Sequence, residues 1–240
     1  MHARPAGRLR AAVLAGSLVL ALSAWNNLVV PRLPDRPGSY VAANLTATAV
    51  LLAAARAAGL SWAELGLARS RLTAGARWGG ACALLVATGY AVALAVPALR
   101  PLLMDARIGR LDGGEVAYQA LVRVPLGTVV WEEVAFRGVL LAALARVLPL
   151  PVAAGIAAAV FGVWHVRPTI GALAANDLAV EPLARVLAVA FAVLGTAAAG
   201  AFFTWLRLRS GSLLAPALLH LATNSLGTLA AAVSFRPGPG

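Results

Sequence analysis

Long apolar stretches separated by short polar ones run through the whole chain. They lie near residues 11–30, 40–59, 78–98, 117–148, 150–166, 183–206 and 212–233. Most are close to the roughly 20 residues that a helix needs to cross a bilayer. The pattern predicts an all-α, polytopic membrane bundle of seven or eight transmembrane helices, with no room for a folded soluble domain between them.

Two segments depart from this simple pattern. Residues 117–148 are too long for one span, because at about 1.5 Å per residue they exceed a hydrocarbon core of roughly 30 Å. We expect this stretch to break or kink beside Pro125 or at the charged motif W-E-E-V-A-F-R, residues 131–137. Residues 61–72 are amphipathic and begin with a capping box of Ser61 and Glu64, which predicts a short helix lying at the interface.

Composition strengthens the membrane interpretation. Of the 240 residues, 61% are hydrophobic and 12% charged, whereas soluble domains have roughly 45–50% and 25%. The net charge of +11 comes from arginines that flank the apolar stretches, so we expect them to anchor the protein to membrane lipids and not to bind nucleic acid. The single Cys82 excludes an intramolecular disulfide and a thiolate metal site.

The positions of the arginines also bear on orientation. The N-terminal tail and the loop near residues 69–77 are both rich in arginine, which predicts a cytoplasmic N-terminus, although the arginines of the following loop weaken the bias. The first stretch also resembles a signal peptide. Its apolar character continues to Val30, which favours a retained helix.

A few ionisable or strongly polar side chains interrupt the apolar stretches, where each costs roughly 2.5–3.5 kcal/mol at the centre of a span. They are Glu132, Glu133, Arg137, His165, His220 and Asn224. Glu133 and Arg137 are four residues apart, which places them on one helix face as an ion pair. Glu132 lies on another face and has no basic partner nearby in the sequence.

The histidines have the same four-residue spacing to a neighbour. His220 precedes Asn224, and Phe161 precedes His165, so each pair projects from one helix face. Each polar residue alone could simply bond a neighbouring helix. Four of them from three separate stretches, Glu132, His165, His220 and Asn224, predict a shared site in a cavity of the bundle.

A carboxylate and two imidazoles without a partnered Ser or Cys indicate hydrolysis by water. In one scheme Glu132 and His165 deprotonate the water, while His220 and Asn224 stabilise the oxyanion. In the other, Glu132, His165 and His220 ligate a zinc ion that holds the water. The sequence leaves both schemes open, and it contains neither H-E-x-x-H nor G-x-G-D, the motifs of two other classes of intramembrane protease.

Three motifs in order resemble those of a known family. E-E-V-A-F-R at 132–137, F-G-V-W-H at 161–165 and H-L-A-T-N at 220–224 are similar to the E-E-x-x-x-R, F-x-x-x-H and H-x-x-x-N motifs of the CPBP family. This family includes CAAX prenyl proteases of the Ras-converting-enzyme type and bacteriocin-processing or self-immunity proteins. The resemblance covers about residues 78–233, which would form the catalytic core of a single domain, residues 1–240.

The resemblance implies an eight-helix intramembrane endopeptidase of the bacterial cell membrane, with a cavity open to the membrane and the cytosol. Glu132 and His165 match the water-activating pair, and His220 and Asn224 the oxyanion-stabilising pair. Glu133, Arg137 and Phe161 would support the site. The family is usually catalogued as metalloproteases, which makes zinc the implied cofactor, and the implied substrate is a peptide or a lipid-modified protein.

Two other functions remain open from the sequence. The first is a non-catalytic membrane immunity or scaffold protein that retains the motif residues for structure. The second is a proton-coupled transporter in which Glu132 and His165 relay protons, although no inverted repeat supports it. The native substrate, the pathway and the oligomeric state are not fixed by the sequence.

Overall fold

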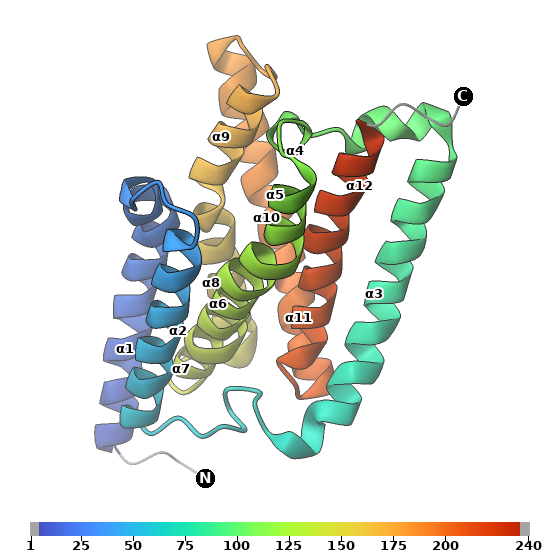
Figure 1. Ribbon diagram of the computed structural model, residues 1–240. Helices are drawn as coiled ribbons and strands as arrows, with labels where there is room; N and C mark the ends of the chain where they lie inside the picture. Colours follow the sequence, from blue (N-terminus) through green and yellow to red (C-terminus); the bar gives the residue numbers. More distant parts are fainter. Residues whose placement is uncertain (1–4, 236–240) are drawn as a thin grey trace.

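The computed structural model describes residues 5–235, and within that range every regular element is a helix (Figure 1). The chain enters through α1 (Pro5–Ala24), which continues into η1 (Trp25–Val29) and η2 (Val30–Arg32). It returns through α2 (Ser39–Ala57), and a run of turns with η3 (Arg69–Arg71) leads to α3 (Leu72–Ala95). Two short elements, η4 (Pro97–Leu103) and α4 (Ala106–Gly109), follow.

The fourth apolar stretch forms one continuous helix that slants through the middle of the bundle (Figure 1). We call it the central helix; it consists of α5 (Gly113–Tyr118), η5 (Gln119–Val129), α6 (Val130–Glu132), η6 (Glu133–Leu140) and α7 (Leu141–Ala145). It does not break into two helices, but its turns are irregular at both places where a break or kink is expected, beside Pro125 and at the charged motif. Both η5 and η6 are π-helical, and the wider turn of η5 accommodates Pro125, which lacks an N–H and crowds the preceding turn of an α-helix.

The remaining elements complete the bundle. They are α8 (Leu150–Trp164), α9 (Val166–Ala175), α10 (Pro182–Ser210), α11 (Leu214–Leu221), η7 (Ala222–Leu226) and α12 (Gly227–Ser234). In the described residues, 6 helical segments are long and apolar enough to cross a membrane. The central helix runs through the bundle that these segments form, and the protein is an integral, multi-pass, all-α membrane protein, as the apolar pattern predicts (Figure 1).

Burial distinguishes the inside of the bundle from its lipid-facing surface. Residues 131–144 of the central helix are buried on every face, and α1, α2 and α8 pack around them. In contrast, Leu85 of α3 and Phe191 of α10 are 74% and 73% exposed, as expected for side chains in contact with lipid tails. The charged motif therefore lies in the most enclosed part of the molecule.

Close packing between α8 and α10 depends on a small residue in the F-G-V-W-H motif. A Cβ at Gly162 would lie 2.7 Å from the carbonyl oxygen of Val193. Small residues at such positions let helix backbones approach each other in membranes. Gly162 thus fixes the position of the helix end that carries His165.

The segment between α2 and α3 differs from its prediction. The predicted capping box is present: the Glu64 carboxylate accepts a hydrogen bond from Ser61 N at 2.7 Å, and Ser61 Oγ accepts one from Glu64 N at 3.2 Å. The predicted amphipathic helix is absent from this segment, where turns follow the capping box. Arg146 binds Glu64 at 2.8 Å. Burial alone would raise the pKa of Glu64, but hydrogen bonds from Arg146 and Ser61 lower it to about 2. The ionised Glu64 therefore ties these turns to the end of the central helix.

Candidate active site

The central helix carries Glu132 and Glu133 side by side at the junction of α6 and η6. Both are buried, with exposed fractions of 3% and 1%. π-helical turns occur here, in η7 beside His220 and in η1 at Asn26, so three elements that contribute to the site have locally widened turns. Such turns change which side chains share a face, and they are frequent at functional sites.

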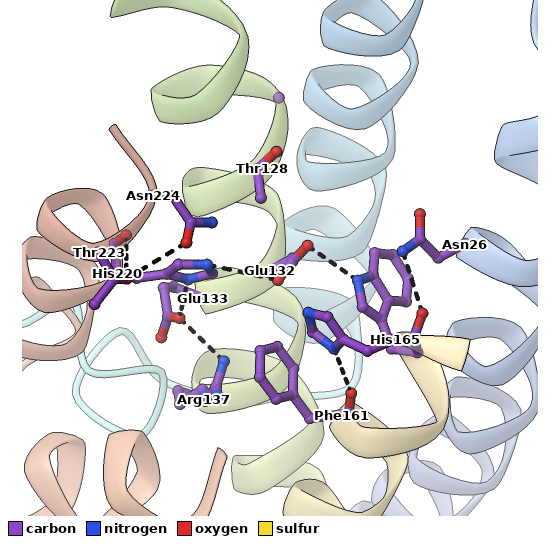
Figure 2. Close-up of polar contacts among 12 residues, drawn as sticks. Asn26, Thr128, Glu132, Glu133, Arg137, Phe161, His165, His220, Thr223 and Asn224 are labelled. Carbon is purple, nitrogen blue, oxygen red and sulfur yellow. Dashed lines mark hydrogen bonds and ion pairs between the residues drawn. The ribbon is translucent and has the colours of Figure 1, made fainter. Parts of the chain in front are cut away.

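Glu133 joins a buried network with two partners. Its Oε1 accepts from Arg137 at 3.0 Å, which agrees with the ion pair predicted from their spacing, and it also lies 2.8 Å from His220 Nδ1 (Figure 2). The second contact was not expected, since the sequence assigns Glu133 to Arg137 alone. Because the Glu133 carboxylate accepts a hydrogen bond from His220 Nδ1, the ring nitrogen left for a second partner is Nε2.

Aromatic rings enclose the other end of this network. The Arg137 guanidinium lies 3.9 Å from the centroid of Phe161 and 4.9 Å from that of Phe203. Cation–π contacts of this kind stabilise a charge that has lost its water. Phe161 therefore supports the site by holding Arg137, and its ring also packs against His165 at 4.6 Å between centroids.

Glu132 is held differently from its neighbour. Its Oε1 accepts from the indole Nε1 of Trp164 at 3.0 Å. Its Oε2 has no hydrogen-bond partner among the described residues and lies 3.8 Å from His220 Nε2. Glu132 thus has one oxygen fixed by a hydrogen bond and one buried oxygen without a hydrogen bond in the described part of the chain.

His165 lies at a break between two helices. α8 ends at Trp164 and α9 begins at Val166, and the His165 Nδ1 lies 2.8 Å from the carbonyl oxygen of Phe161. A carbonyl can only accept, so Nδ1 carries the proton and Nε2 has the free lone pair. His165 can therefore act as a base or ligand through Nε2.

A cavity of about 940 Å³ brings most of these groups together. Glu132, His165 and Asn224 line it, whereas His220 is buried behind Glu132 and does not. Asn224 accepts from Thr223 at 3.4 Å through Oδ1, and among the described residues its Nδ2 has no acceptor. Of the four residues predicted to share a site, three face one cavity and the fourth contacts it through Glu132.

Comparison with known proteins finds one matching family. The model of the family described as type II CAAX prenyl endopeptidase, Rce1-like, matches residues 115–226. This match supports assignment of the chain to the CAAX protease family. The matched residues include all three motifs, and the match supports a CAAX-type intramembrane endopeptidase in general terms. Searches of curated proteins and of solved structures found no match.

The segment that matches the CAAX protease family does not contain the whole site. Asn26 and Asn27, in η1, bind backbone carbonyl oxygens at the α8–α9 break. Asn26 donates to the carbonyl oxygen of Trp164 at 3.2 Å, and Asn27 donates to that of Val163 at 2.9 Å. Asn27 Oδ1 also accepts from the backbone N–H of Arg167 at 2.9 Å. We call these two side chains the asparagine clamp; they hold the backbone on both sides of His165.

The sequence offered a weak signal for these additional residues. The clamp appears as W-N-N near the end of an otherwise apolar stretch, and Trp164 as the residue before His165 in F-G-V-W-H. Neither has a spacing that identifies its partner, because Asn26 and Trp164 are 138 residues apart in the chain. Only the contacts between η1 and α8 bring these residues to the candidate site.

The donor atoms do not fit the zinc site that the family implies. A catalytic zinc typically has three protein ligands. Among the described residues, no group of three or more His, Cys, Asp or Glu side chains is arranged to hold a metal ion. Glu132 Oε2 and His220 Nε2 approach each other, but His220 Nδ1 is occupied by Glu133 and His165 faces Phe161 with its Nδ1. We therefore derive no step of the reaction through a metal.

Proposed function

We propose that the protein hydrolyses peptide bonds within the membrane with a water activated by Glu132 and His165. One observation carries the proposal: Glu132 faces the cavity with Oε1 fixed by Trp164 and with Oε2 unpartnered among the described residues. A carboxylate held in this way is oriented to accept a proton. Its substrate would be a peptide or a lipid-modified protein that reaches the cavity from the membrane.

The reaction needs one proton to move twice. Glu132, with His165 Nε2 as second acceptor, would take a proton from the water as its oxygen attacks the scissile carbonyl carbon. Asn224 Nδ2, together with His220 when Nε2 is protonated, would donate hydrogen bonds to the oxyanion that forms. The proton then passes from Glu132 to the leaving nitrogen as the C–N bond breaks, and the carboxylate is restored.

The neighbouring groups support this role without touching the substrate. Glu133 fixes His220 through Nδ1, so that Nε2 points to the side of Glu132. Arg137 offsets the charge of Glu133 inside the bundle. We place the protein in the bacterial cell membrane, where lipids surround the exposed faces of α3 and α10.

The test uses the full-length protein in lipid nanodiscs with an internally quenched, farnesylated CAAX peptide. Glu132→Gln and His165→Ala should each lower the cleavage rate by about 100- to 10,000-fold, because each removes an acid–base group. Glu181→Gln is the matched control, since Glu181 caps α10 without any side-chain hydrogen bond. Full activity of Glu132→Gln would exclude Glu132 as the acid–base group, whereas a wild type that cleaves no peptide would favour a scaffold or immunity role.

Metal analysis of the same sample tests the alternative scheme. Zinc would require His165 to turn toward Glu132 and His220 so that three ligands meet. Zinc at unit stoichiometry, lost together with activity on chelation and regained with it, would support that scheme over the metal-free one. We expect chelation to leave the rate unchanged.

A further inference from the structure

A row of polar side chains follows one face of the central helix away from Glu132. Gln119, Arg123, Thr128 and Glu132 all line the same cavity. Arg123 is the cation in this row. The sequence alone suggests that it snorkels from near the end of a span, but its place in the cavity lining indicates that a bound molecule would meet it.

Arg107 and Arg167 also line the cavity, but neither belongs to the central helix, and Arg123 differs from Arg107 in having no carboxylate partner among the described residues. Arg107 is already paired with Asp105 at 2.6 Å, and hydrogen bonds from Arg107 hold the pKa of Asp105 below its ordinary value, so that pair stays ionised and satisfied. No carboxylate among the described residues lies within ion-pair distance of Arg123. Its positive charge is left for a ligand.

The side chain of Arg123 is also held in one orientation. Its guanidinium carbon lies 4.2 Å from the centroid of the Tyr40 ring, and the Tyr40 hydroxyl lies 3.2 Å from Thr128 Oγ1. A guanidinium that stacks on a ring uses its face for that contact and keeps the N–H groups at its edge free. The free edge matches a carboxylate, which binds arginine through two parallel hydrogen bonds.

The distance along the helix suggests which carboxylate. Arg123 precedes Glu132 by nine positions, which corresponds to about 13 Å of rise in an α-helix and somewhat less where turns are π-helical. An extended peptide covers about 3.3–3.6 Å per residue, so three or four residues fill this span. A peptide with its scissile bond at Glu132 would thus bring its own C-terminus to Arg123.

We propose that Arg123 binds the C-terminal carboxylate of the peptide substrate. This inference rests on the proposed function, since it assumes that Glu132 marks the scissile bond. Tyr40 is a positioning residue for the guanidinium.

Two peptides that differ only at the C-terminus test the proposal. Both are internally quenched, farnesylated CAAX peptides, one with a free carboxylate and the other with a carboxamide, offered to the full-length protein in nanodiscs. The wild type should cleave the acid about 10- to 100-fold faster in kcat/KM, the range expected for a charge-assisted bidentate contact. Arg123→Gln should lose that advantage by slowing the acid alone, and Arg123→Lys should recover part of it.

The control and the contrary outcomes are specific. Arg110→Gln removes an exposed arginine outside the cavity lining and should preserve the preference for the acid. Equal slowing of both peptides in Arg123→Gln, or a preference that survives it, overturns the proposal. If the wild type cleaves neither peptide, the proposed function fails, and binding decides the inference separately. In a Glu132→Gln background, fluorescence anisotropy should show tighter binding of the acid, and Arg123→Gln should abolish the difference.

Discussion

Two adjacent glutamates in the central helix have different environments and therefore different roles. Glu133 is surrounded by Arg137 and His220, so both of its contacts serve to hold charge and geometry. Glu132 has a neutral donor, Trp164, and lines the cavity, which Glu133 does not. Spacing alone predicts the pairing of Glu133 with Arg137, but it cannot find Trp164, because the indole belongs to another helix.

The buried ion pair gives a stability prediction. Arg137→Met leaves the Glu133 charge in the bundle with His220 alone, and breaking a buried pair in this way costs roughly 3–5 kcal/mol. Adding Glu133→Gln to that variant should restore most of the free energy of unfolding but not the activity, since His220 loses its charged partner. Unfolding in mixed micelles measures the free energy of unfolding, and peptide cleavage measures the activity. A single variant as stable as the wild type would contradict the role of the pair.

At the scale of elements, the apolar pattern predicts the helices well but not their irregular turns. Length and hydropathy identify each span, because a bilayer requires an apolar helix of limited length. They do not identify the π-helical turns of η5, η6 and η7, or the break at His165, since these depend on contacts with other helices. The asparagine clamp is one such contact: it satisfies carbonyls that the break leaves open.

The clamp predicts a loss of activity from a residue distant in sequence from the motifs. Asn27→Ala removes the contacts of Asn27 with Val163 and Arg167, so His165 should be less well positioned. We expect kcat to fall about 10- to 100-fold, the loss typical when a group that orients a functional histidine is removed. KM should stay near its wild-type value. Ser23→Ala is the control, because the Ser23 hydroxyl bonds only to Val19 within its own helix. A change in KM alone would show that the clamp shapes binding and not the position of His165.

At the scale of the whole molecule, the cavity and the N-terminal end of α1 lie at opposite ends of the bundle. The cavity is lined by Val30, Tyr40 and residues of the loop after α3, whereas the turns near Glu64 lie at the other end with the start of α1 (Figure 1). A cytoplasmic N-terminus and a cavity open to the cytosol therefore exclude each other. The arginine positions favour a cytoplasmic N-terminus, whereas the family resemblance favours a cavity open to the cytosol.

Labelling of single cysteines resolves the orientation. In a Cys82→Ala background, Ala63→Cys and Arg110→Cys should react with an impermeant maleimide from opposite sides of sealed vesicles. Both positions are exposed. The segment between α2 and α3 and the segment that follows α4 lie at opposite ends of the bundle (Figure 1). The side that labels Arg110→Cys is the side to which the cavity opens. Labelling of both positions from one side would contradict the bundle as described.

The buried network of the central helix also has a consequence for biosynthesis. Arg137 follows Glu133 by four residues, so the ion pair can form as soon as this turn of helix emerges, and the helix can enter the membrane as a nearly neutral segment. His220 comes 87 residues after Glu133. At about 5–20 residues per second, the ribosome delivers it roughly 4–17 s later. During that interval the nascent protein holds a charged helix whose arginine partner is present and whose histidine has not yet been made.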